Sequence, residues 1–258
     1  QKLSLLFALL PAAAGVHAET PIPLWNGAVY NQPVETIKAQ NGVFDCSQRG
    51  RQMLCRGNVE FAGHNDWAGL LLHGRQTQGC LALCARLSLA HFKDAAAAVR
   101  KSGMTPAVLT DQEDKVAFDF FQAKIQSKSM AAIDRDLAEK ETELLKGKKV
   151  GYVFIGVKTL LENVKGGSVT NAAKFFQVHA PRTLRTTEIL LDDQGVAVSF
   201  RAPMAVQDET GKSMLEEKQA NNARPGRHKQ NELRSRIRAK LVFSVVEPNY
   251  SALAACSR

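Results

Sequence analysis

The alternation of apolar and polar positions predicts a β-hairpin between residues 43 and 61. Apolar residues lead into a polar, glycine-bearing turn at residues 47–52 and lead out of it again. A period of two around such a turn is typical of antiparallel strands. Cys46 and Cys55 flank the turn, so they could lie opposite each other at the Cα separation of about 5.5–6 Å that a disulfide prefers.

We therefore expect a structural disulfide between Cys46 and Cys55. A redox-active pair or half of a metal site is the alternative. Neither cysteine lies in the CxxC context that activates a thiol, and this favours the structural bridge.

Helical periodicity and capping residues predict five helices, at residues 33–38, 91–101, 129–146, 159–164 and 168–178. The last of them is expected to be capped by Ser168. Apolar runs bounded by turns predict five further strands, at residues 104–109, 116–121, 150–157, 184–191 and 196–202. Hairpins interrupted by single helices predict an α+β fold, an antiparallel sheet of hairpins with helices packed on one face. Residues 19–103 and 104–210 would form its two halves, and a degenerate duplication would make these similar.

The first 18 residues have the composition of a secretory signal peptide. Lys2 precedes the apolar run 3–10, and residues 16–18 give the small-x-small ending of a signal peptidase site. The run is too short to span a membrane, and no other stretch of the sequence reaches about 18 consecutive apolar residues. We therefore expect a soluble mature protein that begins at Glu19 and is periplasmic or secreted; a core helix is the alternative interpretation of residues 3–10.

Three consecutive segments resemble a known group of proteins: a short helix led by proline, a hairpin and a helix that ends at glycine, PVETIKA, GVFDCSQRGRQMLCRGNVEFAG and HFKDAAAAVRKSG. In this order they resemble small exported bacterial envelope proteins such as the small lipoprotein of the outer-membrane β-barrel assembly machine. The resemblance rests on element order and covers the first hundred residues. It implies two helices on a three-stranded sheet and a binding or scaffolding role. Membrane anchoring is not implied, because no cysteine follows the leader to carry a lipid.

Basic residues are concentrated near the C-terminus. The formal net charge is +9, and residues 218–240 hold eight Lys or Arg residues against one acid, a net +7. One interpretation is a surface for anionic lipid or lipopolysaccharide, formed by Arg224, Arg227, Lys229, Arg234, Arg236, Arg238 and Lys240. The alternative is a solvated, disordered or aberrant tail at residues 211–258. Nucleic acid is not expected as a partner, because no aromatic residue interleaves with these charges.

Residues 65–90 break the alternation where the first hairpin needs its next strand. One hypothesis is a frame slip in the source gene, since residues 72–86 read one nucleotide later can encode two strands joined by an Asp-Gly turn. Residues 219–258, where Arg replaces Lys as the usual basic residue, raise the same question of reading frame. Cys80 and Cys84 would then be accidental. As a strand they stand about 13 Å apart, too far to bridge each other, and their pairing with Cys256 stays open.

Histidines and one carboxylate provide the candidates for a metal site: His64, Asp66 and His73, with His91 nearby in the sequence. No HExxH or paired CxxC spacing accompanies them, so we expect ordinary histidines, no metal and no cofactor. The sequence also lacks a GxSxG nucleophile motif and a P-loop. We therefore expect a binding or scaffolding protein of the cell envelope with no catalytic residues. The alternative is a secreted metal-dependent hydrolase that uses His64, Asp66 and His73.

Overall fold

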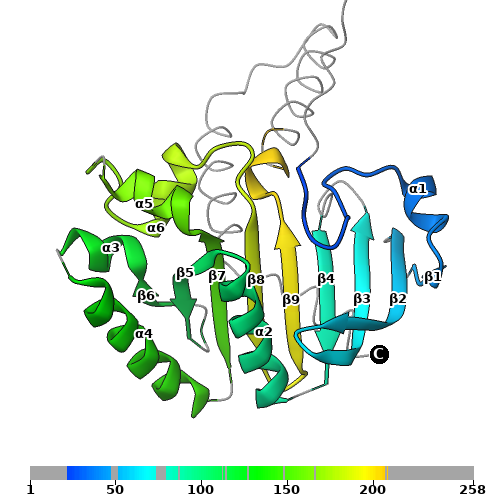
Figure 1. Ribbon diagram of the computed structural model, residues 1–258, viewed down its shortest axis with the longest axis horizontal. Coiled ribbons are helices and arrows are strands. Elements are labelled where there is room, and N and C mark those ends of the chain that lie inside the picture. The colour runs from blue at the N-terminus through cyan, green and yellow to red at the C-terminus, as the bar shows by residue number, and fades with distance from the viewer. Residues whose placement is uncertain are drawn as a thin grey trace, which may run out of the picture.

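The computed structural model describes residues 22–208, apart from residues 48–51 and 74–79 and positions 87, 112, 114, 127, 148, 166 and 207. Within this part, nine strands form one antiparallel sheet in the order β1-β2-β3-β4-β9-β8-β7-β5-β6 (Figure 1). The predicted α+β class is confirmed. The proposed signal peptide at residues 1–18 and the basic tail at residues 211–258 lie outside the described residues.

The strands are β1 (Val43–Asp45), β2 (Gln52–Phe61), β3 (His64–His73), β4 (Cys80–Ala85), β5 (Met104–Thr110), β6 (Val116–Asp119), β7 (Val150–Gly156), β8 (Thr186–Leu191) and β9 (Val196–Arg201). The helices are α1 (Val34–Lys38), α2 (Leu89–Lys101), α3 (Phe120–Ile125), α4 (Met130–Leu145), α5 (Val157–Lys165) and α6 (Ala172–Lys174), followed by the π-helical turn η1 (Phe175–His179). None of these helices is long and apolar enough to cross a membrane.

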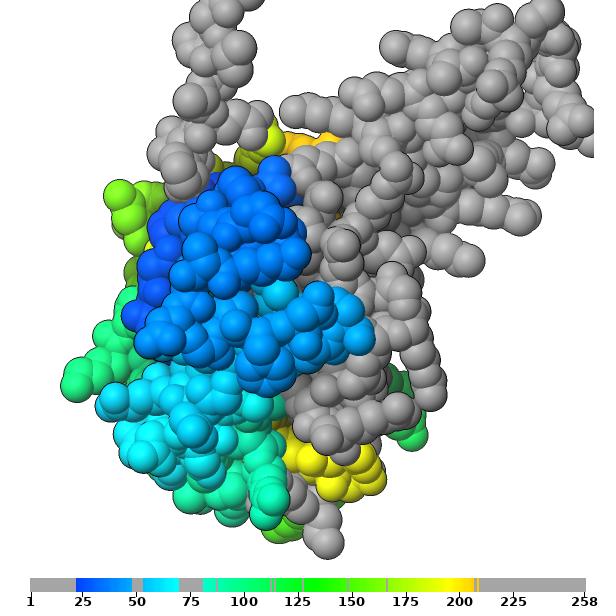
Figure 2. Space-filling view, turned by 90° about the vertical axis from the view of Figure 1, so that its right-hand side faces the viewer, coloured from blue at the N-terminus to red at the C-terminus, as the bar shows by residue number. Residues whose placement is uncertain are grey.

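A single pairing, between β4 and β9, joins the two halves of the chain into one sheet. Leu81 lies opposite Phe200 and Ala85 lies opposite Val196, in antiparallel register. The first half supplies β1 to β4, and the second half supplies β5 to β9. Figure 2 is viewed from the side of β1 and shows the described residues from position 22 to β1 (blue) beside the β2 and β3 residues (cyan) on this edge of the molecule.

The main core lies between the sheet and the helices drawn in front of it, α2 and α4 (Figure 1). Strand positions alternate between faces, so Ile189 and its partner Val198 share the face on which Phe92 of α2 stacks with Tyr152, at 5.8 Å between ring centroids. All four side chains are buried. Neighbouring positions place a smaller buried cluster on the opposite face, formed by Cys84, Leu190 and Ala197.

Short polar side chains fix where the helices begin. The Ser88 hydroxyl accepts from the backbone N–H of His91 at the start of α2, and the Ser129 hydroxyl accepts from the N–H of Ala132 at the start of α4. Each bond satisfies a backbone donor that the helix itself leaves unpaired. The predicted helices 91–101 and 129–146 are therefore observed, the first starting two residues earlier than expected.

Two sequence predictions placed the beginning of a helix wrongly. The expected strand 116–121 stops at Asp119, whose carboxylate caps α3, so Phe120 and Phe121 are helical and buried. The expected helix 168–178 is capped by Asn171 rather than Ser168 and passes into the π-helical turn η1. In both places a capping side chain decided the boundary where the apolar pattern alone was ambiguous.

Residues 64–73 and 80–85 form the strands β3 and β4, which their sequence pattern did not predict. β3 and β4 pair through positions 68–72 and 80–84, and Leu81 and Leu83 enter the main core. The sequence as it stands therefore supplies this hairpin, and the frame slip stays an untested hypothesis. Cys84 is disulfide-bonded, and the cysteine that completes this bond lies outside the described side chains.

The predicted disulfide between Cys46 and Cys55 is confirmed, with Cα atoms 5.8 Å apart. It ties the end of β1 to β2 beside the pair Phe44–Cys55. Closing a loop of this length removes freedom from the unfolded chain, which on the chain-entropy model stabilises the fold by about 2–3 kcal/mol.

We expect the double substitution Cys46→Ser, Cys55→Ser to lower the free energy of unfolding by about 2–3 kcal/mol in urea titrations. Untreated wild-type protein in the same titration serves as the reference, because a reductant would also break the disulfide bond of Cys84, which the double variant keeps. An unchanged urea midpoint, together with two free thiols at these positions in peptide mapping, would contradict the bridge.

Candidate functional site

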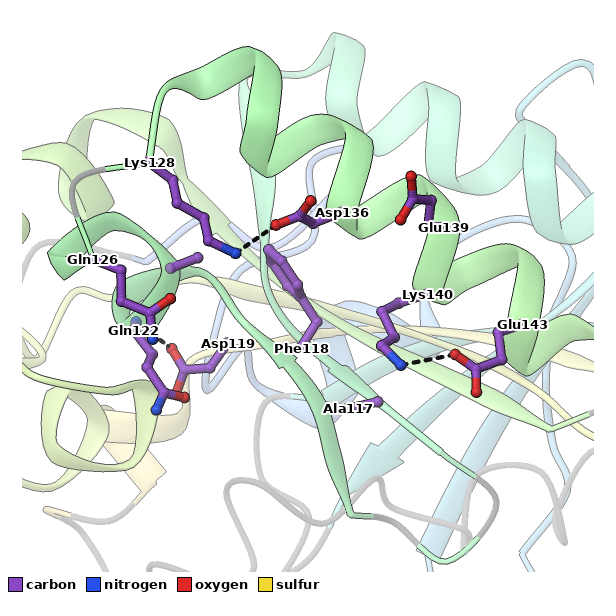
Figure 3. Close-up of a pocket in the computed structure, with 11 residues that line it drawn as sticks. Ala117, Phe118, Asp119, Gln122, Gln126, Lys128, Asp136, Glu139, Lys140 and Glu143 are labelled. Atoms are coloured by element: carbon purple, nitrogen blue, oxygen red, sulfur yellow. Dashed lines mark hydrogen bonds and ion pairs between the residues drawn. The ribbon is translucent and has the colours of Figure 1, made fainter.

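A pocket of about 360 Å³ lies between β6, α3 and α4 (Figure 3). β6 is the last strand of the sheet and pairs with β5 alone among the described strands. The pocket is lined by residues of these three elements and of the segment that joins α3 to α4: Ala117, Phe118, Asp119, Gln122, Ala123, Gln126, Lys128, Asp136, Glu139, Lys140 and Glu143. We call this pocket the β6–α4 groove.

Asp119 holds the end of the groove together. One carboxylate oxygen accepts from the backbone N–H of Gln122 at 3.1 Å, and the other accepts from the N–H of Ala172 at 2.8 Å. Burial raises the pKa of Asp119, and these backbone donors partly offset the rise. Because both oxygens are engaged in capping α3 and bracing α6, Asp119 serves the structure of the groove.

The wall formed by α4 is charged. Lys128 donates to Asp136 at 2.6 Å, and Lys140 donates to Glu143 at 2.8 Å (Figure 3). These hydrogen bonds lower the pKa of Asp136 and of Glu143, so both carboxylates are ionised at neutral pH. Glu139 is 72% exposed. Four carboxylates and two lysines line the groove in total, which gives it a net negative charge.

Apolar surface accompanies this charge. Val116 at the start of β6 is 49% exposed, and Ile125 and Met130, near the facing ends of α3 and α4, are also exposed. The lining residues include no histidine, serine, threonine or cysteine. The groove therefore combines charged and apolar surface, the parts needed to bind a chain segment.

A separate cluster brings together three of the residues singled out from the sequence, His64, Asp66 and His91. One potential metal-ligand atom from each lies within 4.8 Å of the other two. Nε2 of His91 is 2.9 Å from Asp66, and Nε2 of His64 is 2.9 Å from Asp94. The hydrogen bond from His91 lowers the pKa of Asp66.

The third sequence candidate, His73, does not join this cluster. Its backbone pairs with Gln52 at the opposite end of β3, roughly 30 Å along the strand from His64. The hydrolase hypothesis with His73 as a ligand therefore lacks its geometry. Asp94 was missed, although it lies three residues after His91 on the same predicted helix, a spacing that places both on one helix face.

The groove was not predicted at all. The carboxylates of residues 129–146 look like an ordinary solvated helix face, and nothing local in the sequence shows that β6 ends the sheet beside them. The candidate anionic-surface residues, Arg224, Arg227, Lys229, Arg234, Arg236, Arg238 and Lys240, lie outside the described residues. The chain matches no protein-family model, no curated protein and no solved structure.

Proposed function

We propose that this is an exported binding protein of the bacterial cell envelope that holds an extended, basic segment of a partner protein in the β6–α4 groove. The observation that carries the proposal is the terminal strand β6, whose outer edge pairs with no described strand and which lines a pocket under an acidic helix. Export is supported by the leader-like N-terminus and by the Cys46–Cys55 disulfide, since such bonds persist in oxidising compartments.

Strand addition suits the backbone of β6. A strand at the edge of a sheet presents unpaired N–H and C=O groups, and an extended peptide can pair with them. β6 spans only Val116–Asp119, so the added segment would be short and would gain further contacts from α4. Alternate side chains of such a segment would meet the pocket and the exposed Val116.

The negative charge of α4 would favour a basic segment over an acidic one. Glu139 projects from α4 with no described partner closer than Arg135, whose guanidinium nitrogen lies 3.9 Å away. Asp136 and Glu143 add negative potential, although each is paired with a lysine. A lysine or arginine of the partner would be attracted here, and an acidic segment would be repelled.

The test is fluorescence polarisation of the mature protein with a short labelled peptide of alternating lysine and valine. We expect binding that the substitution Glu139→Lys weakens by about 1 kcal/mol, roughly fivefold in Kd, because it replaces an attraction by a repulsion.

Glu162→Lys on α5 is the matched control. Glu162 is also exposed and also lies 3.9 Å from a basic partner, Lys158, but it does not line the groove. This variant should bind the peptide as the wild type does. Equal weakening by both variants, or equal binding of a peptide with glutamate in place of lysine, would overturn the proposal.

A further inference from the structure

We infer that His64, Asp66 and His91 form a binding site for a divalent ion of the zinc class, with Asp94 as the residue that positions His64. The site lies on β3 and α2, and none of its residues lines the β6–α4 groove. It therefore stands independently of the proposed function.

Local structure brings the ligands to one place. The turn from β2 to β3 passes through Ala62 and Gly63 with φ of 54° and 82°, so β3 begins at His64. Two residues later Asp66 projects to the same side of the strand. From the other direction, capping of α2 by Ser88 fixes the first turn of the helix, which carries His91.

The four side chains pair across the two elements. The strand histidine, His64, bonds the helix carboxylate Asp94, and the helix histidine, His91, bonds the strand carboxylate Asp66, each at 2.9 Å. The two imidazole rings stack with centroids 3.8 Å apart and planes inclined by 22°. Such crossed pairing holds both rings and both carboxylates in a single cluster.

Each histidine can offer one ring nitrogen to an ion, because a metal binds an imidazole through the nitrogen that carries no proton. In His91 this nitrogen would be Nε2, which lies 2.9 Å from Asp66, while Nδ1 is buried. In His64, Nε2 bonds Asp94, so Nδ1 would be the ligand atom.

The kinds of ligand atom in the cluster determine which metal ions it suits. Two imidazole nitrogens and a carboxylate oxygen are typical ligands of zinc and its first-row neighbours, whereas calcium and magnesium prefer oxygen ligands alone. With bonds of about 2.0–2.1 Å, tetrahedral ligand atoms lie about 3.3 Å apart, so no pair of the present atoms, all within 4.8 Å of one another, needs to approach by more than about 1.5 Å. Asp66 is 61% exposed, so its side chain has room to exchange the hydrogen bond with His91 for a bond to the ion. Asp94, bonded to one nitrogen of His64, would orient that ring as a carboxylate commonly does behind a metal-bound histidine.

Calorimetric titration of the full, metal-stripped chain with zinc chloride tests the site. We expect binding of one zinc ion per chain. His64→Ala, Asp66→Asn and His91→Ala should each abolish this binding, while His179→Ala, a described histidine on η1 far from the cluster in sequence, should leave it unchanged. Asp94→Asn should keep the stoichiometry but weaken the affinity roughly 10- to 100-fold, with Asp94→Glu recovering part of it.

A spectroscopic measurement separates ligation from mere structural support. The cobalt-loaded wild type should show the absorption of nitrogen and oxygen ligands in a low-symmetry site, and Asp66→Asn, an exposed position that should not disturb folding, should change it. No binding by the wild type, or binding that survives all three ligand substitutions, overturns the inference.

Discussion

Replacing Gly195 by alanine is expected to destabilise the protein by about 3 kcal/mol or more. Gly195 has a φ of 152°, and an added Cβ would lie 2.4 Å from the backbone carbonyl oxygen of Ala85. A backbone oxygen within a strand cannot move aside as a flexible side chain would. The same turn is tied by Asp192, whose carboxylate accepts from the N–H groups of Gln194 and Gly195, so the turn cannot easily shift either. Urea unfolding followed by circular dichroism would measure the loss.

Gly167→Ala is the matched control for this substitution. Gly167 also has a positive φ, 65°, but no atom lies within 4 Å of its added Cβ. It should therefore cost only the backbone strain of a non-glycine residue in the left-handed region, about 1–2 kcal/mol. Equal losses in the two variants would show that the close contact with β4 contributes nothing.

The second large effect is expected for Arg201→Met. The guanidinium of Arg201 lies 3.2 Å from the carboxylate of Glu188, and both side chains are largely buried in neighbouring strands of the central sheet. Removing the cation leaves a buried carboxylate without its countercharge, a loss of about 3–5 kcal/mol in comparable pairs. We expect a loss of that order in urea titrations near pH 8.

The loss should shrink as the pH falls. Burial already raises the pKa of Glu188 and the charge of Arg201 lowers it, so the variant should have a still higher folded-state pKa. A carboxyl group with a raised folded-state pKa takes up its proton more readily in the folded protein than in the unfolded chain. Stability is therefore lost as pH rises from the unfolded pKa through the folded pKa, and it is regained on acidification.

Titrations of Arg201→Met near pH 5 and near pH 8 check this sign. The double variant Arg201→Met, Glu188→Leu is the control, because it removes both charges. It should therefore not show the pH-dependent loss of stability of the single variant. A loss of the same size at both pH values in the single variant would mean that Glu188 does not respond to the missing cation.

Features determined by neighbouring residues were predictable. The cysteines that flank a polar turn gave the β1–β2 disulfide, and the Asp-Asp-Gln-Gly turn at residues 192–195 gave the β8–β9 hairpin. The charged and apolar faces of residues 129–146, with Ser129 before them, gave α4. In each case the pattern, the turn and the cap indicate the same element.

The sequence pattern did not predict β4, and the reason is physical. It lies inside the sheet, between β3 and β9, and its positions 81–84 are all buried. A strand covered on both faces has no polar face and therefore no alternation, so its apolar run cannot be distinguished from a helix or from noise. Phe120 and Phe121 were wrongly predicted as strand residues, because an apolar pair suits a strand and a buried helix equally.

In the candidate sites, too, local features could be predicted from the sequence and features that depend on packing could not. His64 and Asp66 could be placed on one strand face from their spacing, whereas the approach of His91 depends on how α2 packs against β3. The β6–α4 groove requires the strand order of the whole sheet, since only that order makes β6 a terminal strand. Packing and strand order are non-local, and no window of sequence contains them.

The junction of β4 with β9 has a kinetic consequence. Pairing Leu81 with Phe200 closes a loop of more than one hundred residues, and contacts so distant in sequence slow folding because the chain entropy is lost before the contact can repay it. A nascent chain would expose the unpaired edge of β4 until β9 had been synthesised. The complete sheet can therefore form only after the ribosome has added β9, well after the residues of β1 to β4 have been synthesised.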